Sequence, residues 1–165
     1  MTLSPVFRSP KAVQLLAEKG IWSQLALDIE AQADAVRAVH RDFEGVIGAG
    51  FRKPANPAPA DWTVTTPKGL EFVQEYFFLI LFRSIFRSLG VEEGRLQAYS
   101  ELNFCIKGTI TAADNLFDDQ SKTLLPLAQN AGSRFMSILQ LMAFERLTRS
   151  VLDRAVSVSI VEEGA

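Results

Sequence analysis

The chain has 165 residues, of which 48% are hydrophobic, and a formal net charge of −2 at neutral pH. This length favours a single domain with a sizeable core, and the apolar content argues against intrinsic disorder. The slightly acidic balance excludes nucleic acid as a main partner, because a protein that binds the phosphate backbone needs a net basic face. The only cysteine, Cys105, excludes an internal disulfide framework and predicts a reducing, cytoplasmic location.

The longest apolar run covers residues 76–82, which is far too short to span a bilayer. Arg83 follows it at once, so we expect no transmembrane segment and interpret the run as part of a buried helix. Phenylalanine is abundant, with 12 residues against 2 tryptophans and 2 tyrosines. That excess suggests either a Phe-rich core or an apolar pocket.

Apolar spacing and helix-ending residues predict an all-α fold, a helical bundle of about five main helices in one domain, residues 1–165. A short first helix is expected from Ser9 to Gly20 and a second over about residues 21–49. The second has an apolar seam at helical spacing: Leu25, Ile29, Val36, Phe43 and Ile47. We expect Asp28 and Asp34 to lie on its opposite, solvated side.

A proline-rich loop is predicted at residues 52–67, where four prolines forbid a regular helix. Within it, residues 62–65 are the one place where an extended segment is expected, and a connection of this length is often functional. A third helix is predicted from about Pro67 to Leu89. A fourth is predicted from about Val91 to beyond Asp119, and a fifth from about Gly132 to Val156.

The fourth predicted helix leads into the acidic segment 114–119 (Asp-Asn-Leu-Phe-Asp-Asp), the one part of the sequence with an evident chemical character. Residues three and four apart share a helix face, so one apolar set predicts its buried side: Leu102, Ile106, Thr109, Ala113 and Leu116. A second, polar stripe contains Ser100, Asn103, Lys107, Thr111, Asp114 and Asp118. We expect this stripe to face a cavity and to place Asp114 and Asp118 one turn apart.

Two carboxylates one turn apart weaken a helix by roughly 0.2–0.5 kcal/mol, and acids near a helix C-terminus also oppose its dipole. A divalent cation would compensate for both effects. Mg²⁺ prefers oxygen ligands and is usually held by one or two carboxylates together with substrate phosphates and water. The spacing of Asp114 and Asp118 therefore favours a Mg²⁺ site, and the alternative is a solvated acidic patch partly offset by Lys122.

The acidic segment also resembles the first aspartate-rich motif, DDxxD, of class I isoprenoid synthases, which include polyprenyl diphosphate, terpene and squalene synthase-like enzymes. Asn115 stands where that family usually has its second Asp. The preceding helix, from Tyr99 onward, is similar to the motif-bearing helix of the family, and residues 132–147 resemble the helix that follows it. More loosely, residues 50–54 resemble the basic glycine loop that grips diphosphate.

This resemblance implies Mg²⁺-dependent chemistry on a prenyl diphosphate, either prenyl transfer or ionisation of an allylic diphosphate. It implies that Asp114 and Asp118 are the catalytic metal ligands, with Asp119 as a nearby alternative. The diphosphate contacts that it implies are Lys107, Arg52, Lys53 and Lys122. The prenyl cavity would be lined by Ile110, Thr111 and the Phe-rich third helix.

A class I site, as the resemblance implies, needs carboxylates on two facing helices, and only one such helix is evident in the sequence. The paired arginines that usually follow the motif are also replaced, by residues 120–122 (Gln-Ser-Lys). We therefore expect only the N-terminal half of the family chain, completed by a C-terminal half or by a second copy in a homodimer. The alternative is a non-catalytic helical module that binds a lipid or a partner helix through its third helix.

Other chemically notable residues receive structural interpretations. His40, the only histidine, is expected at the edge of the core with one hydrogen bond, and Cys105 is expected to be inert packing beside a buried face. Three arginines of the fifth helix are expected on its outer edge: Arg146, Arg149 and Arg154. That helix is apolar nearly all round, which predicts neighbours on every side.

Overall fold

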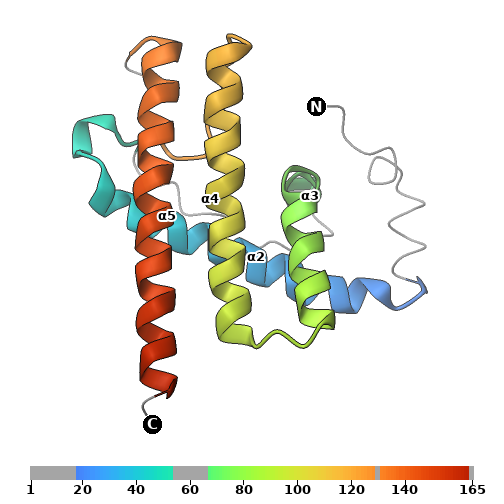
Figure 1. Cartoon of the computed structure of the whole chain (residues 1–165). Helices are drawn as coiled ribbons and strands as arrows, with labels where there is room; N and C mark the ends of the chain where they lie inside the picture. Colours follow the sequence, from blue (N-terminus) through green and yellow to red (C-terminus); the bar gives the residue numbers. More distant parts are fainter. Residues whose placement is uncertain (1–17, 54–66, 129–130, 164–165) are drawn as a thin grey trace. The chain divides into compact units, whose positions relative to one another are not determined.

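The structure, a computed structural model, describes residues 18–53, 67–128 and 131–163. These residues form four α-helices and one turn of 3-10 helix (Figure 1): α2 (Ile21–Val46), η2 (Ala49–Phe51), α3 (Pro67–Ser88), α4 (Glu93–Phe117) and α5 (Ser133–Glu163). The predicted all-α class is confirmed. Nearly all of the first predicted helix, and the expected extended segment 62–65, lie outside the described residues. None of the described helices combines the length and the apolar character needed to cross a membrane.

Several helix boundaries follow from residues with restricted or unusual backbone preferences. α3 begins at Pro67, whose fixed φ and missing N–H suit the first helical position. The chain turns at Gly20 and Gly90, where φ is 70° and 80°, a region that residues with a Cβ disfavour. α5 continues to Glu163, beyond its predicted end at Val156, so its β-branched tail is helical.

The chain divides into two compact units, and α2 and α4 contribute residues to both. The described part of the first unit is residues 18–34 and 67–96. Its core consists of apolar residues of α2, α3 and the start of α4: Ile29, Ala33, Phe72, Val73, Leu79, Ile80 and Leu96. α3 is kinked at Tyr76, where φ is −110° and ψ is 18°.

A buried ion-pair cluster joins α2 to α3 in this first unit. Asp28 is only 1% exposed, and its carboxylate lies 3.7 Å from Nε of Arg83 and 2.7 Å from a terminal guanidinium nitrogen of Arg87. Arg83 also pairs with Glu93. The expectation that Asp28 lies on a solvated face is therefore wrong, because two arginines of α3 neutralise it inside the unit, whereas Asp34 is exposed as expected.

The described part of the second unit is residues 35–53 and 97–163. Here α4 and α5 lie side by side with opposite directions, and the second half of α2 crosses them (Figure 1). The rings of Phe104 and Phe144 meet edge to face, with centroids 5.7 Å apart and an interplanar angle of 75°. Gly108 lies directly against the second ring, since a Cβ added there would sit 2.0 Å from Cζ of Phe144.

The buried side of α4 consequently differs from the predicted one. Its buried residues include Phe104, Cys105, Gly108, Ala112 and Asn115. Ile106, which the sequence placed on the buried side, is 51% exposed, and that prediction is wrong. The absence of a side chain at Gly108 lets Phe144 of α5 approach closely, and this contact outweighs the greater hydrophobicity of the Ile106 side. Cys105 is fully buried, as its packing role requires, and burial raises the pKa of its thiol to about 12.

One arginine connects three helices of the second unit. Arg154 of α5 pairs with Asp42 of α2 and, at 2.6 Å, with Glu101 of α4. Glu101 is buried, and its carboxylate also accepts from Nε2 of Gln97 at 2.9 Å. The contact fixes the crossing of α2 over α4 and α5.

Candidate functional site

α4 ends inside the acidic segment, through a hydrogen-bond pattern typical of helix C-termini. The N–H of Asp118 still donates to the carbonyl of Asp114 at 2.8 Å, whereas the N–H of Gln120 reaches back to the carbonyl of Asn115 at 3.2 Å. Asp119 between them has a φ of 51°, so the end of α4 is a Schellman motif with Asp in the left-handed position. The helix therefore ends at Phe117 and not beyond Asp119 as predicted, because Asp119 turns the chain away.

The three carboxylates of this segment all lie at the surface. Asp114 and Asp118 are one turn apart, as predicted, and both are exposed, as is Asp119. Asp119 also lies 3.9 Å from Nε of Arg134. The described part of the chain contains no group of three or more His, Cys, Asp or Glu side chains placed to hold a metal ion. We expected the polar stripe of α4 that ends in Asp114 and Asp118 to face a cavity. Among the described residues this expectation is wrong, because both carboxylates are exposed at the surface.

Three polar side chains from three helices fix the loop that follows the acidic segment. Asn115 of α4 donates from Nδ2 to the carbonyl of Lys122 at 2.7 Å and accepts from the N–H of the same residue at 3.2 Å. Gln140 of α5 accepts from the N–H of Leu124 at 2.9 Å and donates to the carbonyl of Lys122 at 3.3 Å. His40 of α2 lies 2.9 Å from the carbonyl of Leu124. All three therefore bind the same short stretch of backbone.

His40 has the structural role that was expected of it. A carbonyl oxygen can only accept, so Nε2 of His40 carries the hydrogen of its bond to Leu124. Its ring also meets Phe104 edge to face, with centroids 5.7 Å apart. Burial lowers the pKa of His40, and the bond to the Leu124 carbonyl offsets part of that effect. The imidazole is therefore held neutral as a packing and hydrogen-bonding group.

The basic segment after η2 pairs with the far end of the same loop. Arg52 forms an isolated antiparallel bridge with Leu127, and the N–H of Lys53 donates to the carbonyl of Pro126 at 2.8 Å. On the other side of the bridge, the N–H of Ala128 donates to the carbonyl of Phe51 at 2.8 Å. The fold thus brings the predicted diphosphate-gripping residues to the loop that begins at the acidic segment.

The remaining predicted site residues lie on α4 and in the loop. Lys107 and Thr111 are half-buried on α4, and Lys122 is exposed. Ile110 is 55% exposed and lines an open groove of about 610 Å³ between α4 and α5, whereas Thr111 does not contribute to its wall. The proposed lining of a prenyl cavity by the Phe-rich third helix stays a prediction.

A small polar pocket that the sequence did not suggest lies between the loop and the start of α5. Its volume is about 230 Å³, and its walls include four hydroxyl and two amide side chains: Ser121, Thr123, Ser133, Ser137, Asn115 and Gln140. Both amides already bind the backbone of the loop. The only sequence signal for this pocket is the density of hydroxyl and amide residues after the acidic segment.

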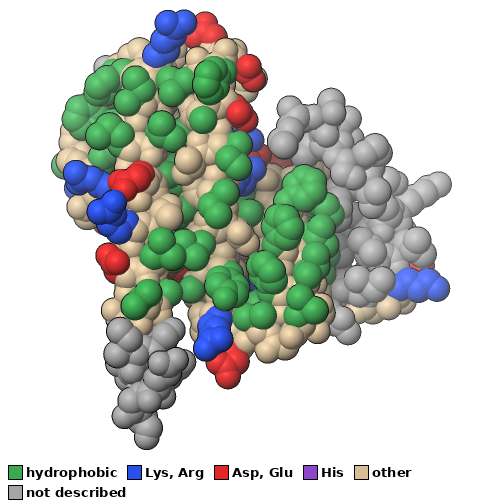
Figure 2. All heavy atoms as spheres, viewed as in Figure 1, with side chains coloured by type: hydrophobic (Ala, Val, Ile, Leu, Met, Phe, Trp, Pro, Cys, Tyr) green, Lys and Arg blue, Asp and Glu red, His purple; other side chains and the backbone are tan. Residues whose placement is uncertain are grey.

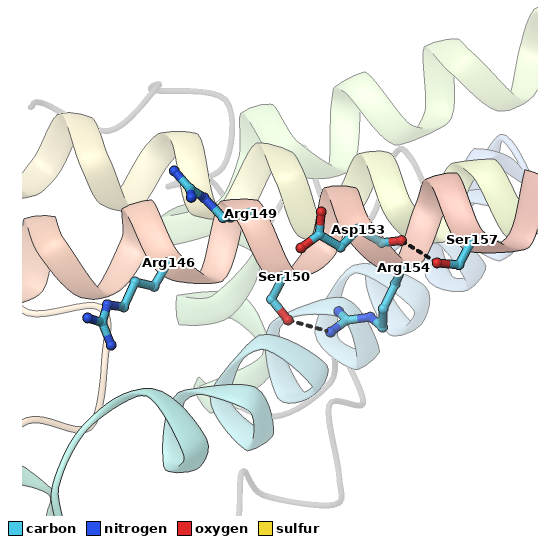
Figure 3. Close-up of a pocket in the computed structure, with 6 residues that line it drawn as sticks. All are labelled: Arg146, Arg149, Ser150, Asp153, Arg154 and Ser157. Atoms are coloured by element: carbon cyan, nitrogen blue, oxygen red, sulfur yellow. Dashed lines mark hydrogen bonds between the residues drawn. The ribbon is translucent and has the colours of Figure 1, made fainter.

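An open groove of about 580 Å³ runs along α5 (Figure 3), lined by Arg146, Arg149, Ser150, Asp153, Arg154 and Ser157. Arg146 and Arg149 are exposed on the outer side of the helix, as expected, whereas Arg154 is directed toward α2 and α4, so the expectation is wrong for this residue. Arg154 pairs with two carboxylates, and Arg149 pairs with Glu145 at 3.0 Å. Their charges are therefore largely neutralised, which weakens the case for a phosphate site here.

Comparisons with known proteins add no assignment: no family model, no curated protein and no solved structure matches this chain.

Proposed function

We propose that this chain carries one half of a Mg²⁺-dependent site of the class I isoprenoid synthase type. In this site Asp114 and Asp118 hold Mg²⁺ and, through it, the diphosphate of a prenyl substrate. The observation that carries the proposal is the exposure of both carboxylates one turn apart at the end of α4, next to Phe117, which is 87% exposed. Carboxylates that only balanced charge within the fold would be expected to contact basic side chains, as Asp28 does.

The residues present fit the protein's share of such a site. Mg²⁺ is commonly held by one or two carboxylates, with phosphate oxygens and water completing its octahedron. Asp114 and Asp118 supply that number, and Asp119 is less suited because it lies beside Arg134. A bound Mg²⁺ would supply charge stabilisation of the departing diphosphate.

The chain's other residues would position and attract the diphosphate. Asn115 and Gln140 hold the loop after α4 through hydrogen bonds to the backbone of Lys122 and Leu124. Arg52 and Lys53 are tied to the same loop by backbone pairing, and Lys122 lies within it. Basic side chains near one anion-binding segment raise the local concentration of a diphosphate.

A class I site needs carboxylates on a second, facing helix, and we propose that another polypeptide segment supplies it. The described residues offer two carboxylates for the metal, which is enough for weak binding but leaves most of the diphosphate charge unanchored. Because this chemistry depends on positioning, a loosely held diphosphate loses most of the rate advantage. We therefore expect binding without efficient turnover from this chain alone.

Thermal unfolding in Mg²⁺ and inorganic diphosphate tests the binding step. A ligand that binds only the folded state raises stability by about 2.7 kcal/mol at a concentration of 100 Kd, so the Tm should rise. Asp118→Ala and Asp114→Ala should each abolish the rise. Without ligand, Asp118→Ala should be neutral or slightly stabilising, because it removes one of two like charges.

Asp153→Ala is the matched control, because it removes another exposed carboxylate from a helix of the same unit. This variant should keep the Tm rise in Mg²⁺ and diphosphate. If the wild-type Tm does not move, or moves equally in Asp118→Ala, the proposed metal site is refuted.

Turnover is tested with dimethylallyl, geranyl and farnesyl diphosphates in Mg²⁺, each with and without isopentenyl diphosphate. The chain alone should release no diphosphate above the rate of the Asp118→Ala variant. Robust release by the chain alone would show that a complete second metal site exists within these 165 residues.

A second candidate function, a non-catalytic module that binds a lipid or a partner helix, is favoured by the surface of α3. Four large apolar side chains of α3 at helical spacing, and Leu89 just after its end, are 37–73% exposed: Phe78, Leu81, Phe82, Ile85 and Leu89. Figure 2 shows apolar side chains gathered along α3. Co-sedimentation with phosphatidylcholine vesicles that Phe82→Glu abolishes and Asp118→Ala preserves would favour this function over the first.

A further inference from the structure

α5 carries a row of exposed residues at alternating steps of three and four, the spacing of a coiled-coil seam. We call it the α5 seam: Phe135, Ile138, Met142, Glu145, Arg149, Leu152 and Val156, all of them exposed. The opposite side of the helix is buried in the core through Met136, Ala143, Phe144, Leu147 and Val151. α5 therefore has a second, largely apolar side, which the described part of the chain leaves exposed apart from a contact between the rings of Phe135 and Phe51, whose centroids are 6.2 Å apart.

The neighbouring surface of α4 extends this apolar area. Tyr99, Ile106, Ile110 and Phe117 recur at steps of seven and four and are all exposed. Between the two helices runs the groove of about 610 Å³, whose wall includes Ile106, Ile110, Glu145, Arg149 and Leu152. Figure 2 shows apolar side chains gathered over both helices. We call this surface, the α5 seam with these four residues of α4, the α4/α5 face.

The area of this face is close to what a stable interface requires. Nine of its residues are large and apolar, four on α4 and five on α5, and most are about half exposed. At roughly 80 Å² of exposed apolar surface each, they offer about 700 Å². One partner in a standard protein–protein interface contributes about 800 Å². Monomeric proteins seldom leave so large an apolar surface uncovered.

The only charged residues of the α5 seam lie at its centre. Glu145 and Arg149 pair with each other at 3.0 Å, and their side chains are 62% and 75% exposed. Figure 3 shows that Arg149 leaves α5 on a different side from Arg154, which bonds Ser150 at 3.3 Å. Arg149 therefore stays on the seam and not in the cluster that joins α5 to α2.

From this arrangement we infer that the α4/α5 face is the interface of a homodimer in which the two α5 helices cross antiparallel, with the two-fold axis midway between Glu145 and Arg149, at the level of the buried Leu147. A two-fold axis there places Glu145 opposite Arg149 of the second copy, because both are two residues from that point. The same operation places Met142 opposite Leu152 and Ile138 opposite Val156. Each charged residue then meets the opposite charge, and each of these apolar residues meets another apolar residue.

A second copy suits this face better than the other possible occupants. A lipid surface would enclose the Glu145–Arg149 pair in hydrocarbon, where charged groups are costly. A purely apolar helix would likewise desolvate the pair and give it no partner. The inference does not depend on the proposed function, since it is argued from the α5 seam and is tested by oligomeric state and not by metal binding.

Charge reversal tests both the dimer and its geometry, with analytical ultracentrifugation of the full chain at micromolar concentrations. The wild type should be a dimer. Glu145→Arg and Arg149→Glu should each weaken dimerisation at least tenfold, because each places like charges across the two-fold axis. An equimolar mixture of these two variants should form a heterodimer, and the double variant should dimerise like the wild type. Since the single variants recover on mixing, failure to fold cannot explain their behaviour.

Two further variants separate this face from other apolar surfaces. Met142→Glu should also give a monomer, whereas Phe82→Glu, the same kind of change on α3, should leave the dimer intact. A wild type that stays monomeric overturns the inference, including one that binds vesicles instead. Charge-reversed variants that dimerise as tightly as the wild type, or that fail to pair when mixed, would exclude the antiparallel arrangement.

Discussion

Asn115 binds both polar backbone groups of Lys122 with a single side chain, donating from Nδ2 at 2.7 Å and accepting at Oδ1 at 3.2 Å. Asn115 is 3% exposed, whereas Lys122 lies at the surface, so these bonds are partly buried. An aspartate at this position could accept from the N–H of Lys122 but could not donate to its carbonyl. The asparagine in the acidic segment is thus explained by the loop that it holds.

Replacing Asn115 with aspartate should therefore destabilise the folded protein. Asn115→Asp should lower the free energy of unfolding by about 1–3 kcal/mol, because a buried carboxylate would face the carbonyl of Lys122. Urea denaturation at neutral pH measures the loss. Asp114→Asn, an exposed change in the same segment, should shift the midpoint very little. An Asn115→Asp variant as stable as the wild type would contradict the assigned role.

The left-handed backbone of Asp119 predicts a stabilising substitution. Asp119 has a φ of 51°, which costs a residue with a Cβ up to about 1 kcal/mol more than glycine. Asp119→Gly should therefore raise the Tm, since the exposed contact with Arg134 that it loses is worth little. Asp119→Ala loses the same contact without the conformational relief and should lower the Tm. The idea fails if the two variants have equal Tm values.

The contact of Gly108 with Phe144 predicts a paired substitution effect. Gly108→Ala places a methyl group 2.0 Å from a ring that is fully buried, so α4 and α5 must separate or the ring must move. We expect a loss of about 3 kcal/mol or more, despite the better helix propensity of alanine. Adding Phe144→Leu should recover part of the loss, because it removes the edge of the ring. Calorimetric melts of the four proteins in this cycle measure the coupling, and purely additive losses would contradict it.

His40 predicts a pH dependence of stability with a definite sign. Burial lowers its pKa in the folded state, so the unfolded chain binds the proton more tightly. The stabilisation that the neutral ring provides is present above the ordinary pKa of about 6.5 and is lost as the pH falls through the lower, folded-state pKa. The Tm should therefore fall between pH 7 and pH 5. His40→Gln should show a smaller fall, and an equal fall in both proteins would refute the role of His40.

Helix boundaries that proline and glycine determine, such as those at Pro67 and Gly90, can be predicted from the sequence. The end of α4 could not be predicted in this way, because the residue in the left-handed position there is Asp119 and not a glycine. α4 also has apolar or small residues on two opposite sides. Periodicity favoured the side of Ile106, whereas close packing against Phe144 selected the side of Gly108.

Long-range contacts explain the other differences between sequence and structure. The sequence predicts that Asp28 is solvated, because its partners on α3 are far away in the chain. Arg87, for example, lies 59 residues further on. The acidic spacing of Asp114 and Asp118 was predictable, since it follows from helix geometry alone. The bonds of Asn115, Gln140 and His40 to one stretch of loop were not, because periodicity does not indicate which backbone groups a buried polar side chain will meet.

The central claim, that Asp114 and Asp118 bind a divalent cation with diphosphate, is tested most directly by paramagnetic NMR. Mn²⁺ replaces Mg²⁺ in oxygen-ligand sites and broadens the signals of nearby amides. With inorganic diphosphate present, the broadening should centre on the amides of residues 111–122 and should disappear in the Asp114→Ala/Asp118→Ala variant. Broadening that centres on another acidic group, or that persists unchanged in this double variant, would contradict the account.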